Sequence, residues 1–279
     1  MTVITPGLLD ETGGVSKGAM TGVGLQAAEA RTNITRITYL FIINTRRSAV
    51  VQVTIGGMDK QTILQKTVDY IRQEFSNDSS GHDWWHVYRV WKNAITICEH
   101  DAERADSFVV QLAALLHDLD DWKLNDAGDE TPLRAKAWLE SCSVDVSTAD
   151  RVCEIIEHIT YKGAGVDNNM GSLEGFIVQD ADRLDAIGAI GIARAFAYGG
   201  YKNRPLYDPD SPPQRHATFE QYKNSKSATI NHFYEKLLLL KDRMNTPTAK
   251  RIAEQRHEVM VQFLSQFMDE WAGADVRAD

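Results

Sequence analysis

The stretch LLHDLDDWK, residues 115–123, places ionisable side chains in an otherwise apolar segment. Leucines precede His117 and Asp118, and one more leucine separates that pair from Asp120 and Asp121. An ionised carboxylate that is buried without a partner is strongly destabilising, so Asp118 is expected to have one. Hydrogen bonds to neighbouring helices would provide it, and so would a divalent metal ion that binds His117 and Asp118.

Two other segments combine the same residue types. GHDWWHVYRVW, residues 81–91, places His82 and His86 one helical turn apart, and VQDADRLDAIG, residues 178–188, carries Asp182 and Asp185. Three helices are therefore expected each to direct a His or an Asp inward. Side chains in the interior of a helix bundle can converge on one metal ion.

Helical periodicity runs from Met58 almost to the C-terminus and predicts an all-α domain over residues 58–279. Thr131 with Pro132 and Thr246 with Pro247 are typical helix starts. The irregular stretch GGYKNRPLYDPDSPPQRH is long for a connection inside a compact domain, which is typical of a functional or mobile loop. The predicted helices span residues 59–76, 83–104, 105–121, 131–142, 147–161, 172–198, 216–243 and 246–273.

Residues 1–57 differ from the rest in being rich in Gly and Thr and lacking helix caps. The apolar run ITYLFII is far shorter than the ~20 residues that span a bilayer. The run AVVQVTI could form a strand, although a lone hairpin is only marginally stable. We expect an irregular N-terminal extension that is disordered or reflects a misassigned translation start.

Composition limits the function classes. With 43% hydrophobic and 25% charged residues in a chain of 279, the protein is expected to be soluble and globular. A formal charge of −9 argues against binding to nucleic acid polymers, which requires clustered Lys and Arg, but allows a small anionic ligand. We expect a cytoplasmic monomer or homodimer that does not bind membranes, with reduced thiols at Cys98, Cys142 and Cys153.

Taken in order, these residues resemble the HD-domain superfamily of metal-dependent phosphohydrolases, which carries a histidine, a His-Asp doublet and a distal aspartate on a helical scaffold. The first histidine matches His86, the doublet matches His117 and Asp118, and the distal aspartate matches Asp182. The resemblance covers roughly residues 58–275 and is strongest to a bacterial subgroup of predicted hydrolases, some similar to nucleotide pyrophosphohydrolases. It implies a single HD-type helical bundle domain, with the N-terminal extension outside the pattern.

The resemblance implies that these four residues bind one divalent metal ion. Two imidazoles and two carboxylates favour Mn²⁺ over Mg²⁺, with Fe²⁺, Co²⁺ or Ni²⁺ also suitable. In several HD phosphohydrolases an acidic residue at the position of Asp121 assists the attack of water, so Asp121 is the predicted catalytic residue. The alternative is that Asp120 and Asp121 only end the helix in solvent.

Further candidates surround these positions with weaker patterns. His82, His158 and His232 could contact phosphate or a second metal ion, although a lone histidine more often has a structural role. The cations Lys123, Lys162, Lys202 and Arg204 are candidate phosphate contacts, with Lys162 preferred, although exposed cations are usually only solvated. The rings of Trp84, Trp85 and Tyr88 could stack on a base or pack in the core.

The leading function is hydrolysis of a small phosphorylated metabolite, foremost a nucleoside triphosphate cleaved to monophosphate and pyrophosphate. The nearest rival is a phosphomonoesterase that acts on nucleoside monophosphates. A di-iron oxygenase would need His158, and a further histidine such as His232, as ligands of a second metal ion. A non-catalytic ligand sensor is the remaining class, and the intact set of four candidate ligands argues against it.

Overall fold

The computed structural model describes the backbone of residues 8–9, 15–16, 36–42 and 50–56, and in full residues 58–76, 83–101, 104–120, 132–159, 170–214 and 227–274. The chain divides into two compact units, Met1–Ile34 and Thr35–Asp279. The first unit contains strands β1 (Leu8–Leu9) and β2 (Val15–Ser16), which pair antiparallel. The proposed boundary between residues 57 and 58 remains a prediction.

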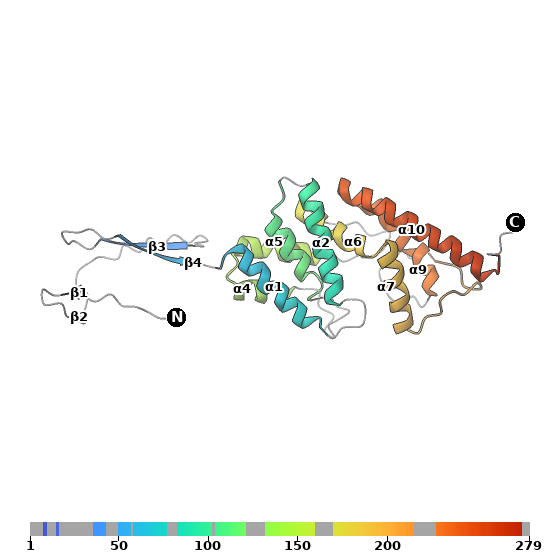
Figure 1. Cartoon of the computed structure of the whole chain (residues 1–279), viewed down its shortest axis with the longest axis horizontal. Helices are drawn as coiled ribbons and strands as arrows, with labels where there is room; N and C mark the ends of the chain where they lie inside the picture. The colour runs from blue at the N-terminus through green and yellow to red at the C-terminus, as the bar shows by residue number, and fades with distance from the viewer. Residues whose placement is uncertain are drawn as a thin grey trace. The chain divides into compact units, whose positions relative to one another are not determined.

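The second unit begins with a two-stranded antiparallel ribbon and continues as helices (Figure 1). Strand β3 (Arg36–Ile42) pairs with β4 (Val50–Gly56) in a register that places Arg36 opposite Gly56 and Ile42 opposite Val50. The strand predicted for AVVQVTI therefore forms, with its partner in the neighbouring apolar run.

Within the described residues from Met58 onward, every regular element is helical, which confirms the all-α prediction. The order along the chain is α1 (Lys60–Glu74), α2 (Trp84–Asp101), α3 (Ser107–Leu116), α4 (Leu133–Ser141), α5 (Val146–Ile159), α6 (Leu173–Asp185), α7 (Gly188–Tyr201), α9 (Thr229–Glu235), the 3₁₀ helix η1 (Leu237–Arg243) and α10 (Pro247–Trp271). No helix in this part of the chain is both long and apolar enough to span a membrane.

Helix α3 is the centre of the bundle. It is apolar around most of its circumference, with Val109, Leu112, Leu115 and Leu116 fully buried. It packs against α1, α2, α5 and α6. Any side chain just after its last residue therefore starts out inside the protein.

The prediction of one helix over residues 172–198 is wrong, because this segment forms two helices. Helix α6 ends at Asp185 and α7 begins at Gly188, whose φ of +78° belongs to the left-handed region that favours glycine. A Cβ on Gly188 would also lie 2.9 Å from the Arg256 side chain on α10. The small residues that the sequence shows here allow a sharp break and close packing.

Two other predicted helices are also shorter than expected. The helix predicted for residues 105–121 ends at Leu116, and residues 117–120 form a turn. In the segment predicted as one helix over 216–243, the described residues form α9 and then η1. The start predicted at Thr246 and Pro247 is confirmed, because the Thr246 hydroxyl accepts a hydrogen bond from the Ala249 amide.

The three cysteines are free and buried, as expected for reduced thiols. Burial raises the pKa of Cys153 to about 11 and that of Cys98 in the same direction. The thiols of Cys98 and Cys153 are therefore held in the protonated form and pack as small apolar groups.

Candidate metal centre

His86 enters the site from the first turn of α2. The Asp83 carboxylate caps this helix by accepting a hydrogen bond from the His86 amide at 2.9 Å. The neighbouring Val87 and Val90 are fully buried, so the same face of α2 carries the His86 ring into the protein, where it is 1% exposed.

His117 and Asp118 lie in the turn after α3, and both are buried. His117 Nδ1 donates to the Ala114 carbonyl at 2.9 Å, which directs Nε2 away from the helix. That Nε2 is buried without a hydrogen-bond partner in the protein, although Asp118 Oδ1 is 3.3 Å away. A buried histidine nitrogen with no partner is costly and indicates a bound group.

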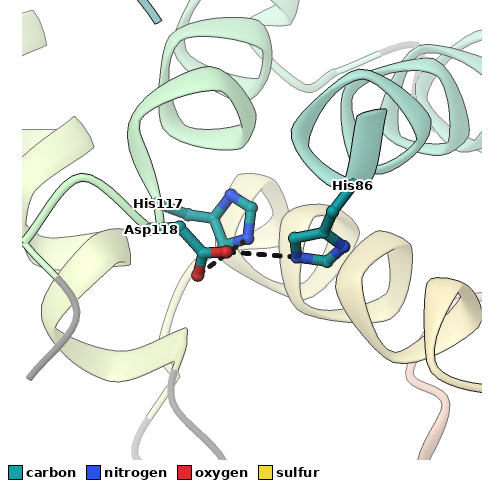
Figure 2. A group of neighbouring side chains, drawn as sticks. All are labelled: His86, His117 and Asp118. Atoms are coloured by element: carbon teal, nitrogen blue, oxygen red, sulfur yellow. Dashed lines mark ion pairs between the residues drawn. The ribbon is translucent and has the colours of Figure 1, made fainter. Parts of the chain in front are cut away.

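The three side chains converge at one point (Figure 2). Asp118 lies between the two imidazoles, with Oδ2 3.2 Å from His86 Nε2 and Oδ1 3.3 Å from His117 Nε2. One ligand atom from each residue lies within 4.8 Å of the other two. Within the described residues this is the one group of three or more His, Cys, Asp or Glu side chains with that geometry.

Asp182, on α6, lies next to this group at its rim. Its Oδ1 is 3.6 Å from His86 Nε2, and its side chain is 37% exposed. The compact group of three does not include Asp182. The structure therefore brings the predicted fourth ligand beside the other three, on the side that solvent can reach.

Asp185 lies behind His86 and was not predicted as a site residue. Its Oδ2 accepts a hydrogen bond from His86 Nδ1 at 2.7 Å. Arg89 donates to the same carboxylate through Nε at 2.6 Å and Nη2 at 3.0 Å, and Arg194 donates through Nη1 at 2.9 Å. The sequence did carry one signal, because Arg89 lies three residues after His86 on the same helix face.

The pKa values of His86 and Asp185 move in opposite directions. Burial and the positive charge of Arg194 oppose protonation of His86, but the hydrogen bonds that the His86 ring donates to Asp118 and Asp185 outweigh them and raise its pKa to about 9. Burial opposes ionisation of Asp185, yet His86, Arg89 and Arg194 hold its pKa well below the ordinary value. The carboxylates around His86 therefore favour a positive charge at this centre.

Two other aspartates near the site form hydrogen bonds with the starts of neighbouring helices instead. Asp120 is buried and accepts hydrogen bonds from the amides of Arg134 and Ala135, which caps α4. For Asp120, the alternative that it ends the helix in solvent is wrong. Asp180 accepts from the Asn245 amide and from both the amide and the hydroxyl of Thr246, which anchors the start of α10.

The other described candidates have different surroundings. His158 Nδ1 donates to the Glu154 carbonyl of its own helix at 2.7 Å. On α9, burial together with the charges of Lys236 and Arg204 lowers the pKa of His232 to about 3. Such cationic neighbours disfavour a metal ion at His232. Neither histidine joins a group that could hold a second metal ion in the part of the chain with described side chains.

The cations after α7 contact aromatic rings. The Lys202 ammonium lies 4.9 Å from the Tyr201 ring centre, and the Arg204 guanidinium lies 5.6 Å from that of Tyr198. His82, Asp121, Lys123 and Lys162 lie outside the described residues, and their roles remain predictions.

The aromatic residues beside His86 divide between core and surface. Trp84 is buried and packs in the core, whereas the Trp85 side chain is 57% exposed and that of Tyr88 is 36% exposed. The rings of Trp85 and Tyr88 meet edge to face, with centres 5.9 Å apart. Of these three rings, those of Trp85 and Tyr88 are the ones that solvent reaches.

The residues present fit a divalent metal ion. The two imidazole nitrogens and the Asp118 carboxylate point into one buried space, and the donor set suits a transition metal ion. The His117 Nε2 that lacks a partner would gain one. His86 Nδ1 is already bonded to a carboxylate, the usual arrangement behind a metal-binding histidine.

Comparisons with known proteins agree with this geometry. Residues 84–187 match the HD domain family. The Bacillus subtilis protein YpgQ is 41% identical over 207 residues, which cover 74% of this chain and 92% of YpgQ. The crystal structure of a Bacillus thuringiensis HD-superfamily hydrolase is 45% identical, covers 77% of this chain and 99% of its own, and gives a TM-score of 0.60. The crystal structure of YpgQ in complex with ADP gives a TM-score of 0.60 at 38% identity, over 76% of this chain and all of that one.

Proposed function

The chain belongs to the HD-domain superfamily, and on that premise we propose that it is a metal-dependent phosphohydrolase for a small phosphorylated metabolite. The substrate that we propose is a nucleoside triphosphate, cleaved to monophosphate and pyrophosphate. The observation that carries the proposal is the convergence of His86, His117 and Asp118 within 4.8 Å of one another in a buried space.

His86, His117 and Asp118 would hold the ion, with Asp182 at the rim as the fourth ligand. When bound, a divalent ion, foremost Mn²⁺, supplies Lewis acidity that makes water a better nucleophile and offsets negative charge on a phosphate group. Fe²⁺, Co²⁺, Ni²⁺ and Mg²⁺ are the other ions to test.

The protein's own groups prepare this chemistry. The hydrogen bond between His86 and Asp185 orients one ligand, and the bond between His117 and Ala114 orients another. Asp182 is partly exposed, so a phosphate group would approach from its side. We assign proton transfer to Asp121 by resemblance to other HD phosphohydrolases.

A nucleotide as substrate has two supports. YpgQ was crystallised with ADP, which shows a nucleotide bound to a relative with 38% identity. In this chain, the exposed rings of Trp85 and Tyr88 offer surfaces on which a base could stack. The free, buried cysteines are consistent with a reducing compartment, so we propose that the protein is cytoplasmic.

A panel of nucleoside tri-, di- and monophosphates, assayed with each metal ion and analysed by chromatography, tests the function. We expect pyrophosphate and monophosphate from triphosphates. Release of inorganic phosphate only from monophosphates would identify a phosphomonoesterase and overturn the proposal. The Asp118→Ala protein, purified identically, is the control for contaminating phosphatases.

A further inference from the structure

Helix α6 carries two buried aspartates, five residues apart, whose contacts differ. Asp180 is fully buried, and its carboxylate accepts hydrogen bonds from Asn245 and Thr246 at the start of α10. Asp185 is 1% exposed and bonds to His86. The two residues share a helix, a side-chain type and a degree of burial. The same substitution at each therefore distinguishes a structural role from a role at the metal centre.

The hydrogen bonds of the Asp185 carboxylate fix its position against the His86 ring. Arg89 grips the carboxylate through two nitrogens and Arg194 adds a third bond, so its position is fixed. The remaining bond is from His86 Nδ1 at 2.7 Å. Because Asp185 accepts the Nδ1 hydrogen, the unprotonated nitrogen of a neutral His86 ring is Nε2, which faces Asp118 at 3.2 Å and Asp182 at 3.6 Å.

We infer that Asp185 is a positioning residue that fixes the ring orientation and tautomer of His86 and thereby strengthens metal binding, with Arg89 and Arg194 holding Asp185 in place. The inference rests on the proposed function, because it assumes that His86 binds a divalent ion. It adds to the centre a buried carboxylate and two arginines that do not themselves touch the ion.

The test compares Asp185→Asn with Asp180→Asn in the full-length, metal-free protein, by calorimetric titration with Mn²⁺. Loss of a carboxylate behind a metal-binding histidine typically weakens metal affinity about 10- to 100-fold. We expect that loss for Asp185→Asn. Asp180→Asn should lower the melting temperature but keep the wild-type affinity for Mn²⁺.

A spectroscopic measurement separates positioning from general loosening. In protein labelled with ¹⁵N-histidine and loaded with diamagnetic Zn²⁺, the His86 ring should show a strongly hydrogen-bonded Nδ1–H. This bond should weaken in Asp185→Asn, because a neutral amide oxygen is a weaker acceptor than a carboxylate, and should be unchanged in Asp180→Asn. His86→Gln assigns the signal. If Asp185→Asn fails to fold, Asp185→Glu, which keeps the charge but moves the carboxylate, should show intermediate Mn²⁺ affinity.

The outcomes distinguish this inference from the proposed function. If the wild-type protein binds no divalent ion, the proposed function fails and the inference fails with it. If the wild type binds Mn²⁺ and Asp185→Asn binds it equally well, the inference alone is wrong. Equal weakening in both asparagine variants would also overturn it.

Discussion

Two histidines in this protein have opposite surroundings. His86, on α2, faces Asp118, Asp182 and Asp185, and its pKa is raised to about 9. His232 lies on α9, where burial, Lys236 and Arg204 lower its pKa to about 3. The surroundings of His86 therefore favour a positive charge at the ring, whereas the surroundings of His232 keep its ring neutral.

The packing around the two histidines explains the difference. Around His86 the chain contributes the carboxylates of Asp118, Asp182 and Asp185, and Arg89 and Arg194 bind Asp185, the buried one behind the ring. The α7, α9 and α10 region is closed by aromatic rings, with Phe196, Phe233 and Phe263 about 6 Å apart between centres. Burial alone does not make a histidine a metal ligand; the sign of the neighbouring charges decides.

The largest expected effect is at Asp118. Replacing it with alanine removes the carboxylate between the two imidazoles, so we expect loss of stoichiometric metal and of all metal-dependent turnover. Metal content by mass spectrometry and the nucleotide assay check this. The matched control is Asp120→Ala, which removes the cap of α4 at a cost of about 0.5–2 kcal/mol but should retain the metal. Full activity in Asp118→Ala would refute the assigned site.

Asp121→Asn should lower kcat by about 10²–10⁴-fold while leaving metal content and substrate affinity unchanged, because a proton-transfer group does not hold the ion. Steady-state kinetics on metal-saturated protein measure the effect. Loss of metal from this variant would instead make Asp121 a ligand.

The third prediction concerns pH. With a pKa of about 9, His86 holds a proton at neutral pH in the metal-free protein, and that proton must leave when a metal ion binds. Apparent Mn²⁺ affinity should therefore rise by about tenfold per pH unit up to about pH 9 and then level off, because one proton is displaced. Calorimetric titrations at several pH values measure the slope, and an affinity independent of pH below 9 would contradict the raised pKa.

The smallest effect is expected at His232. Because its neighbours are cationic and its pKa is depressed, His232→Gln should change Mn²⁺ affinity less than about twofold, although it should lower stability by disturbing buried packing. The same titration, with a thermal melt, tests this. A lost second equivalent of metal in this variant would revive the di-iron alternative.

Much of the scaffold was predictable because apolar periodicity and the helix start at Thr246 and Pro247 are local signals. The convergence of His86, His117 and Asp118 also followed from the sequence, since an inward-facing ionisable group in an apolar segment is unusual. The family resemblance assigned these residues and Asp182 as one set of metal ligands, and the ligand types indicated the metal.

The errors lie where tertiary contacts override local pattern. Periodicity continues through His117, but the chain turns there and Asp120 caps α4, a partner 14 residues away in sequence. The sequence also could not predict that Asp180 binds the start of α10 while Asp185 binds His86, because these roles depend on which helix lies opposite each residue. Arg194 was missed for the same reason.

The break between α6 and α7 has a consequence for protein design. In an unbroken helix, Arg194 would lie about 13.5 Å further along the axis than Asp185, at 1.5 Å per residue, whereas here its Nη1 donates to the Asp185 carboxylate at 2.9 Å. Gly188 makes this return possible through its positive φ and its closeness to Arg256. A design that transfers this metal centre to another helix bundle must therefore keep Gly188, although it contacts neither the ion nor a ligand. It must also keep Arg194, which Gly188 allows to reach Asp185.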